Sequence, residues 1–355
     1  MTATPSHAQP LSKTGQAQRK RYLAATLVTC LGLAIVGLGI LAAQIGSDNI
    51  SKMRHSATYN LKEEPSRIRA MGEDITIQAA YEKEKQHVEG YSVNEVADLL
   101  SNEMWKELNT VIKIPEGPFL MGTDYQRADD QDRPQHKVVL PEYYIDKYPV
   151  TNAQYAKFVV ATGYRSPLHW KNGKIPQGEL LRPVTMVAWD DAAAYAKWAR
   201  KRLPTEAEWE KAGRGTDGRR WPWGNKMEPE RLNTYYNVGS TTDVTKYPNG
   251  ASPYGVMDMS GNVNEWTADD FVPYPGTDAP ADLFQGKIVR PRNKKEFDIV
   301  PTRGKYKVLR GGSWKGDPFS TSLYHRHFAF YYFASNFYGF RCVSDGPVST
   351  QSKGE

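Results

Sequence analysis

The longest apolar run of the sequence lies near the N-terminus, over residues 23–45, and contains no charged residue. A helix rises about 1.5 Å per residue, so about 20 residues cross a hydrocarbon core of about 30 Å, and the run predicts one transmembrane helix. Lys13, Arg19, Lys20 and Arg21 precede it, and no acidic residue does. The positive-inside rule therefore predicts a cytoplasmic N-terminus over residues 1–22, an anchor in the cell inner membrane, and a periplasmic or otherwise extracytoplasmic remainder.

A cleaved signal peptide is the competing interpretation of this run. The apolar regions of signal peptides have about 7–15 residues and end at an A-x-A-like site. The run found here is longer, and Ala42-Ala43-Gln44 is a poor cleavage site. We therefore predict a retained membrane anchor.

Residues 46–112 are polar and charged, with few aromatic side chains, and we predict a stalk there. Within the stalk, Ser92 and Glu95 have the spacing of a capping box. Apolar residues follow at three- and four-residue spacing: Val93, Val96, Leu100, Met104, Leu108 and Val111. The pattern predicts an amphipathic helix over about 93–110. Its apolar face packs either on the chain's own domain or on a partner protein.

From residue 113 onwards, apolar segments shorten and Trp, Tyr, Gly and Pro become frequent. Capping residues predict three helices in this region, with N-caps at Thr151, Asp190 and Thr205. The first and third N-caps also have the spacing of capping boxes. We expect the first helix to end at Gly163 and the third to run towards Gly213.

The remaining signals are those of short strands and turns. Extended runs are predicted over 136–140, 143–148 and 305–309, and Asn249-Gly250 is a strong turn dipeptide. Few helices among many short strands predict an irregular α+β domain over residues 113–345. The last ten residues, 346–355, are predicted to be a disordered tail.

Charge and cysteine content narrow the classes of function. The formal net charge of +6 is mild for 355 residues, and its basic residues are interleaved with acidic ones, so we expect no nucleic-acid partner. The two cysteines are Cys30 and Cys342. With Cys30 in the membrane and Cys342 in a folded domain, the two thiols cannot pair within one chain.

A series of motifs supplies the strongest signal in the domain. In order they are IPEG at 114–117, MG at 121–122, VTN at 150–152, RPV at 182–184, RLPTEAEWE at 202–210, WPWGN at 221–225, DMSGNV at 258–263, EW at 265–266, LRGGSW at 309–314 and GFRC at 339–342. With these motifs, residues from about 112 to 345 resemble the formylglycine-generating enzyme, or sulfatase-modifying factor, family. The resemblance implies a variant of the C-type lectin fold.

The resemblance also implies which chemistry is missing. Family members that generate formylglycine use copper and two cysteines five residues apart, and the matching stretch here reads LYHRHF at 323–328. Leu323 and Phe328 therefore stand where the thiols are expected, and neither can ligate a cuprous ion. Cys342 matches a structural position of the closing motif. We expect no copper-dependent formylglycine generation.

Other relatives differ in chemistry. Iron-dependent sulfoxide synthases take histidine ligands from an additional four-helix domain. Residues 46–112 are too short for that domain and contain no His-x3-His spacing. Further relatives are non-catalytic ligand-binding proteins or structural subunits of cell-envelope machines.

His325 and His327 flank Arg326 where the family has its chemistry, and residues two apart on an extended segment point the same way. They are a candidate pair for a redox metal such as copper or iron, or for zinc, with His136 or His169 as a third ligand. Which metal, if any, the sequence leaves open. The alternative is a polar pocket floor that only makes hydrogen bonds.

Two calcium sites are implied by the resemblance. Asn262, Val263 and Glu265 match the first, and oxygen ligands together with an extracytoplasmic location suit Ca²⁺. The alternative is that Glu265 caps or pairs within the fold. Asn233 and Thr234 match a second and weaker site.

An aromatic run next to the site is a candidate partner-binding surface. It comprises Tyr331, Tyr332, Phe333, Phe337 and Tyr338. So dense a run can hardly face inward throughout, so we expect part of it to be exposed.

Together these features predict a membrane-tethered, catalytically degenerate member of the family that binds a protein partner, as a subunit or as an assembly or maturation factor of an envelope or respiratory-type complex. Two alternatives remain. One is a metal-dependent oxidoreductase that uses His325 and His327, and the other is a receptor that binds a small ligand.

Overall fold

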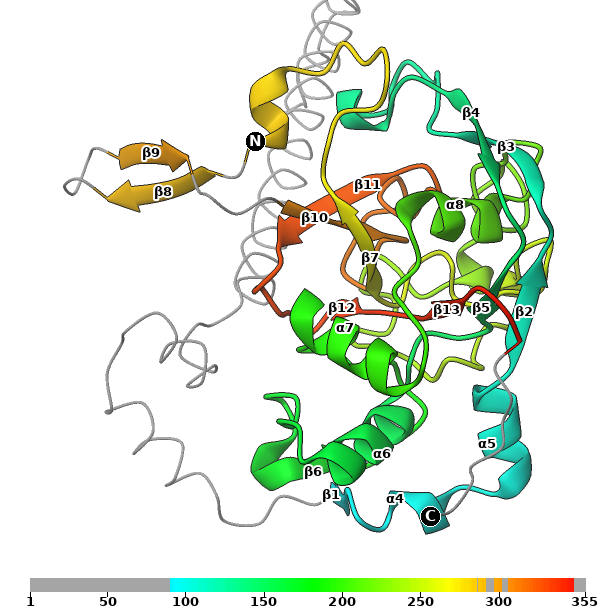
Figure 1. Cartoon of the computed structure of the whole chain (residues 1–355), viewed down its shortest axis with the longest axis vertical. Helices are drawn as coiled ribbons and strands as arrows, with labels where there is room; N and C mark the ends of the chain where they lie inside the picture. The colour runs from blue at the N-terminus through cyan, green and yellow to red at the C-terminus, as the bar shows by residue number, and fades with distance from the viewer. Residues whose placement is uncertain (1–89, 286, 292–296, 302–305, 348–355) are drawn as a thin grey trace, which may run out of the picture. The chain divides into compact units, whose positions relative to one another are not determined.

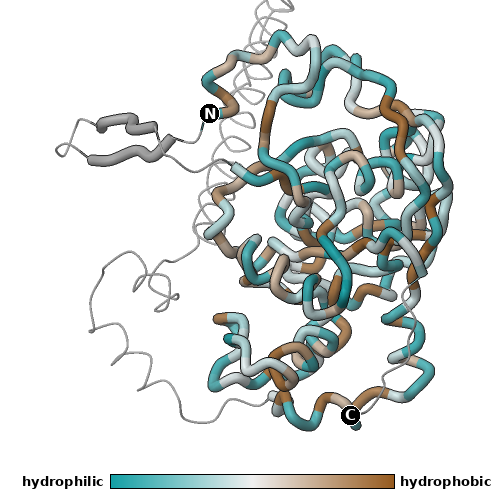
Figure 2. The backbone as a smooth tube through the Cα atoms, in the orientation of Figure 1, coloured by the Kyte–Doolittle hydropathy of each residue, from teal (hydrophilic) through white to brown (hydrophobic). Residues whose placement is uncertain are grey.

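The computed structural model describes residues 90–285, 287–291, 297–301 and 306–347. These residues belong to the larger of the two units into which the chain divides, Leu61–Glu355. The predicted cytoplasmic N-terminus, the transmembrane segment 23–45, most of the predicted stalk and residues 348–355 of the predicted tail lie outside the described residues. Within the described ranges, hydrophobic stretches are short (Figure 2), and no helix is long and apolar enough to cross a membrane.

A four-stranded sheet carries the segment that contains the predicted site (Figure 1). Its order is β11-β10-β7-β12, with β7 at Asn264–Asp270, β10 at Tyr306–Arg310, β11 at Arg326–Phe330 and β12 at Tyr338–Gly339. Strand β10 pairs antiparallel with β7 and β11, and β12 runs parallel to β7. The register places Arg310 opposite Arg326, so their side chains share one face of the sheet.

A second sheet joins the two ends of the domain. Its order is β13-β5-β2, with β13 at Val343–Ser344, β5 at Tyr143–Asp146 and β2 at Val111–Ile114. The other strands form two-stranded ladders: β3 (Gly117–Met121) with β4 (His136–Leu140), β1 (Gly90–Ser92) with β6 (Lys174–Pro176), and β8 (Lys287–Pro291) with β9 (Phe297–Pro301). The strands predicted over 136–140, 143–148 and 305–309 are present as β4, β5 and β10, and the mixed α+β class is confirmed.

Two of the three predicted helices have the predicted capping boxes. Helix α6 covers Asn152–Thr162 and begins at Thr151, and helix α8 covers Glu206–Arg214 and begins at Thr205. Helix α6 ends at Gly163, whose φ of 68° places it in the left-handed region that glycine adopts without strain. Residues next to each end therefore determine where helix α6 begins and ends.

Helix α7 covers Trp189–Trp198, and its predicted N-cap at Asp190 is wrong. The N-cap is Ala188, whose backbone N–H donates to the Asp191 carboxylate at 2.8 Å. The acidic side chain therefore caps the helix from its third position, because Ala188 has no side chain that could do so.

The amphipathic helix predicted over 93–110 is also wrong as a continuous helix. The segment forms α4 (Val96–Leu99) and α5 (Asn102–Leu108), separated by Leu100 in an extended conformation. Ser101 caps α5 by accepting a hydrogen bond from the Met104 N–H at 3.2 Å. Val96, Trp105 and Leu108 are buried in the same hydrophobic core as α6 and α7. Residues 90–112 therefore belong to the globular unit, and the apolar face packs on the chain's own domain.

Aromatic side chains of α6 and α7 form the centre of this core. Tyr155 stacks on Tyr195 with 5.7 Å between ring centroids, and Phe158 and Phe340 pack edge-on against these rings. A second cluster lies around Trp209 of α8 and includes Met259 and Leu323. This cluster therefore joins helix α8 to the segment that leads into β11.

Candidate functional site

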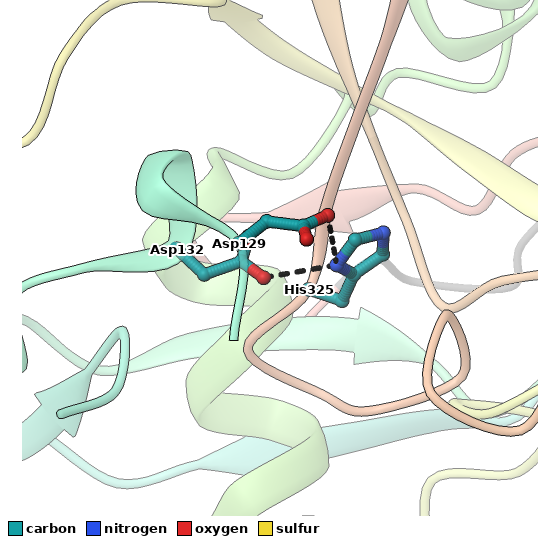
Figure 3. Close-up of side chains that lie close together, drawn as sticks. All are labelled: Asp129, Asp132 and His325. Carbon is teal, nitrogen blue, oxygen red and sulfur yellow. Dashed lines mark hydrogen bonds and ion pairs between the residues drawn. The ribbon is translucent and has the colours of Figure 1, made fainter. Parts of the chain in front are cut away.

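An aspartate–histidine pair lies where the chain enters β11. A one-turn helix at Asp130–Asp132 brings the Asp132 carboxylate against this segment. One Asp132 oxygen lies 2.9 Å from Nδ1 of His325, and the other accepts the Arg326 backbone N–H at 2.9 Å (Figure 3). Asp132 is fully buried, and His325 is mostly buried. The pair is therefore fixed by both its side chains and the backbone.

A second carboxylate approaches the same ring nitrogen. The Asp129 side chain is exposed, and its Oδ2 atom lies 3.9 Å from Nδ1 of His325 (Figure 3). One ligand atom from each of Asp129, Asp132 and His325 lies within 4.8 Å of the other two. Two carboxylates and one imidazole are donors that a divalent cation accepts.

Burial and charge act against each other in this pair. Burial raises the pKa of the Asp132 carboxyl, although His325 and the Arg326 backbone N–H oppose the rise. Burial lowers the pKa of His325, but the Asp132 and Asp129 carboxylates outweigh it, and the net shift of that pKa is upward. Both shifts favour a proton retained between the Asp132 oxygen and Nδ1.

His327 lies beside His325, but it does not belong to the ligand group formed by Asp129, Asp132 and His325. The two rings meet edge to face with centroids 4.5 Å apart. Nε2 of His327 is buried, and no described residue forms a hydrogen bond with it. Burial and the neighbouring His325 charge lower the pKa of His327 well below its usual value. A neutral imidazole with an unpaired nitrogen therefore flanks the pair.

Arg326 points into a buried ionic cluster and not into this site. Its guanidinium donates to both oxygens of Glu206, at 2.7 and 3.0 Å. Arg310 also donates to Glu206, at 2.9 Å, and it pairs with Glu210. Glu210 in turn accepts from Arg214 at 2.5 Å. Arg326 is thus a structural ion-pair residue, although the sequence made it a candidate for chemistry.

Comparison with known proteins identifies the family of the domain. The family model of the sulfatase-modifying factor enzyme 1-like domain matches residues 96–346. The chain belongs to this family. Formylglycine-generating enzyme of Mycobacterium tuberculosis is 31% identical over 309 residues, which cover 68% of this chain and 99% of that protein.

Two further matches define how far the likeness extends. Hercynine oxygenase of Mycolicibacterium smegmatis is 35% identical over 243 residues, which cover 59% of this chain and 55% of that protein. The chain spans about half the length of several curated relatives that it matches. The structure of PvdO from Pseudomonas aeruginosa matches with a TM-score of 0.51 and 25% identity, over 67% of this chain and 95% of that one.

Apolar side chains pack at both positions that the family resemblance assigns to thiols. Leu323 is fully buried among the residues of the Trp209 cluster. Phe328 stacks on Phe271 with 4.2 Å between ring centroids, and Tyr306 packs on it at 4.9 Å. Cys342 is buried, and burial together with the nearby Asp146 charge raises the pKa of its thiol well above the usual value.

Neither of the two residues suggested as a third metal ligand, His136 and His169, lies in the ligand group around His325. His136 lies 3.0 Å from the Pro134 carbonyl oxygen and packs edge-on against Tyr274. His169 packs against Trp170, and burial lowers its pKa to about 4. Neither belongs to the ligand group around His325. Asp132 and Asp129 stand there instead, and sequence reasoning missed them because 193 residues separate Asp132 from His325.

The surroundings of the Glu265 carboxylate are not those of a calcium ligand. It is fully buried, and its oxygens accept Arg341 at 2.6 and 2.7 Å and the Trp209 indole N–H at 2.9 Å. Val263 is buried against Gly339. The alternative stated for Glu265, pairing within the fold, describes its environment.

Side-chain oxygens around Asn262 fit the coordination of a hard cation better than Glu265 does. The Asn262 side-chain NH2 donates to the Asp258 carboxylate at 2.9 Å and to the Thr242 carbonyl oxygen. Oδ1 of Asn262 accepts from the Asn233 side-chain NH2 at 3.4 Å. Oδ1 of Asn233 and Oγ1 of Thr242 are buried without a hydrogen-bond partner among the described residues. Burial raises the pKa of Asp258 to about 7. Thr234, by contrast, donates to the Gly316 carbonyl at 2.8 Å.

The aromatic run is partly exposed, as predicted. Tyr331 is 40% exposed and Phe333 is 42% exposed, whereas Tyr332 stacks on Phe330. Tyr338 packs edge-on against Trp266 of the core, and the half-buried Phe337 packs against Tyr338. The solvent-facing part of the candidate surface is therefore Tyr331 and Phe333.

Proposed function

We propose that this chain is a membrane-tethered family member without thiol-dependent copper chemistry, which binds a protein partner in the periplasm. It would act as a subunit or as an assembly or maturation factor of an envelope or respiratory-type complex. The observation that carries the proposal is the packing at Leu323 and Phe328. Leu323 belongs to a buried apolar cluster, and the half-buried Phe328 stacks on Phe271, so packed apolar side chains stand at both positions.

A direct assay tests the loss of thiol chemistry. Purified full-length chain is loaded with copper and incubated aerobically with a cysteine-containing sulfatase peptide, and mass spectrometry detects the aldehyde product. The formylglycine-generating enzyme of Mycobacterium tuberculosis is the positive control. We expect no aldehyde with this chain, and turnover above the metal-only background would overturn the proposal.

Tyr331 and Phe333 support the partner-binding half of the proposal, because exposed aromatic side chains are enriched at protein interfaces. The test is co-purification of the chain from its native membrane in mild detergent, with masses measured before and after cross-linking. A Tyr331→Ser, Phe333→Ser variant should release the partner. Tyr235→Ser is the matched control, since Tyr235 is 61% exposed outside this surface. A wild-type chain that is strictly monomeric and partnerless would end the proposal.

A metal-dependent oxidoreductase is the second candidate, favoured by the convergence of Asp129, Asp132 and His325. These residues would hold a divalent metal, which would supply redox or Lewis-acid chemistry. His327 would contribute a neutral imidazole beside it. Elemental mass spectrometry of natively expressed protein tests the idea without any activity assay. Stoichiometric iron or copper that is lost in Asp132→Asn and His325→Gln supports it, and native protein without either metal refutes it.

A structural calcium ion near Asn262 is a separate proposal, supported by the unpaired oxygens of Asn233 and Thr242 and by the buried Asp258 carboxyl. Hard oxygen donors of this kind suit Ca²⁺. We expect a chelator to lower the melting temperature and added Ca²⁺ to restore it. Asp258→Asn should abolish this response, and a melting temperature indifferent to chelator would contradict the proposal.

A further inference from the structure

The Arg220 guanidinium lies among four aromatic rings close to the segment that carries the aspartate–histidine pair. Its guanidinium carbon lies 4.6 Å from the Trp221 ring centroid, 4.8 Å from that of Phe319 and 5.0 Å from that of Tyr125. The Tyr324 ring follows at 5.7 Å. Phe319 is 57% exposed and Tyr125 is 40% exposed. Two partly exposed aromatic rings therefore lie within about 5 Å of the Arg220 guanidinium.

The hydrogen-bonding capacity of this guanidinium is largely unused. Its Nε atom donates to the Ser322 hydroxyl at 3.1 Å. Among the described residues, neither Nη atom has a hydrogen-bond partner and no carboxylate pairs with the group. The buried arginines Arg310, Arg326 and Arg341 all pair with glutamates. Arg220 is only partly buried, so the donors of its fork remain accessible.

The backbone ties Arg220 to the neighbourhood of the aspartate–histidine pair. The Leu323 N–H donates to the Arg220 carbonyl oxygen at 2.8 Å. Tyr324, whose ring faces the guanidinium, directly precedes His325. Tyr125 lies in the same connection between β3 and β4 that supplies Asp129 and Asp132. A ligand held at Arg220 would therefore sit beside the segments that carry the pair.

We propose that Arg220, with Tyr125 and Phe319, binds the carboxylate of a ligand that also has a flat apolar part. The guanidinium fork matches a carboxylate in shape and charge, and bonds of this charge-assisted kind are among the strongest hydrogen bonds in proteins. The rings hold the fork in one orientation, and the exposed faces of Phe319 and Tyr125 offer stacking surface to the rest of the ligand. This inference is independent of the proposed function.

Benzoate is the probe, and benzamide is its neutral analogue of the same shape. Binding to the full chain in detergent is followed by ligand-observed NMR. We expect saturable benzoate binding in the millimolar range, with benzamide at least about tenfold weaker, since the charged pair contributes more than 1.4 kcal/mol. The blocked peptide acetyl-Phe-Glu-amide forms a second arm. Tighter binding of this peptide assigns the carboxylate to a peptide side chain, and weaker binding assigns it to a small acid.

The variants separate recognition from packing. Arg220→Gln should remove benzoate binding, and Arg220→Lys should weaken it because lysine lacks the planar fork. Arg231→Gln is the matched control: Arg231 also lies over a tryptophan ring, at 6.0 Å from Trp223, but is paired with Glu228. If Arg220→Gln fails to fold, Phe319→Ser and Tyr125→Ser replace it, since both side chains are exposed. Equal binding of benzoate and benzamide, or benzoate binding unchanged in these variants, would overturn the proposal.

Discussion

Replacing Glu206 by glutamine should strongly destabilise the domain. Its carboxylate accepts three guanidinium hydrogen bonds from Arg326 and Arg310, at 2.7, 2.9 and 3.0 Å, and the Tyr274 hydroxyl at 3.1 Å. Both arginine side chains are fully buried. Glutamine keeps the volume but removes the charge, and it turns one acceptor oxygen into a donor that faces other donors.

The magnitude follows from what remains after the change. Removing one partner of a buried ion pair costs about 3–5 kcal/mol, because an uncompensated charge stays buried. Arg310 keeps Glu210, and Arg326 keeps the carbonyls of Gln131 and Val272 at 3.1 and 3.0 Å. We therefore expect the lower end of that range, about 3 kcal/mol. For a domain of this size, 1 kcal/mol shifts the melting temperature by about 2–4 °C, so a fall of about 6–12 °C should follow.

The effect should also depend on pH. Burial would raise the pKa of the Glu206 carboxyl, but the charges of Arg326 and Arg310 outweigh it and hold this pKa below its usual value. A depressed carboxyl pKa contributes stability that is present above the unfolded pKa and is lost as pH falls through the folded one. The difference between wild type and Glu206→Gln should therefore be full at neutral pH and shrink in acid.

Denaturant unfolding of the full chain, followed by tryptophan fluorescence, measures these differences. Arg326→Met should also be costly, but the double variant with Glu206→Gln should lose less than the sum of the two single losses. Lys113→Met, at the exposed Lys113–Glu142 pair, serves as the control and should cause no resolvable change. A Glu206→Gln variant within about 0.5 kcal/mol of wild type, or strict additivity in the double variant, would refute the reasoning.

Three further predictions concern single features of the fold. Thr205→Ala removes the side chain that accepts the Glu208 N–H at 3.1 Å, and denaturant unfolding should show a loss of about 0.5–2 kcal/mol, whereas Thr205→Ser should retain most of the stability. Burial lowers the pKa of Lys315 to about 8. NMR of the reductively methylated chain should therefore show one lysine signal that titrates near this pH, and the signal should be missing in Lys315→Arg. Between about pH 8 and 10.5 this lysine binds more protons in the unfolded chain than in the folded one, so it should make the free energy of unfolding rise with pH in that range. A Cβ at Gly213 would lie 2.6 Å from Leu323, so Gly213→Ala should cost about 1–3 kcal/mol and should cost much less in a Leu323→Ala background; equal costs in the two backgrounds would count against the packing described.

Features that depend on neighbouring residues were predictable from the sequence. The caps of α6 and α8 lie within four residues of the contacts they make, and the extended run predicted over 136–140 is present as β4. The helix predicted over 93–110 failed because two short helices in line show the same apolar spacing as one long helix. Leu100 is extended there, and Ser101 restarts the helix with its own cap. Only the capping chemistry of Ser101 could have signalled the break.

Features that depend on distant contacts were not predictable. The family motifs located His325 and His327, but Asp132 reaches His325 across 193 residues. Glu206 meets Arg326 across 120 residues, so nothing in the pattern around Arg326 indicated that its charge is consumed inside the fold. The same holds for Glu265, which matched a ligand position by motif and is paired with Arg341, 76 residues away.

The closing segment of the domain has a consequence for biosynthesis. Arg341 neutralises Glu265 and donates to the carbonyls of Asp146 and Met257, while β13 completes the sheet begun by β2 and β5. These contacts come from the last residues of the domain to leave the ribosome. Until then Glu265 is an unpaired acid in a forming core and β5 has an open edge, which is the kind of intermediate that aggregates. A nonsense codon or a protease cut only slightly upstream of residue 339 should therefore yield insoluble protein and not a shortened, working domain.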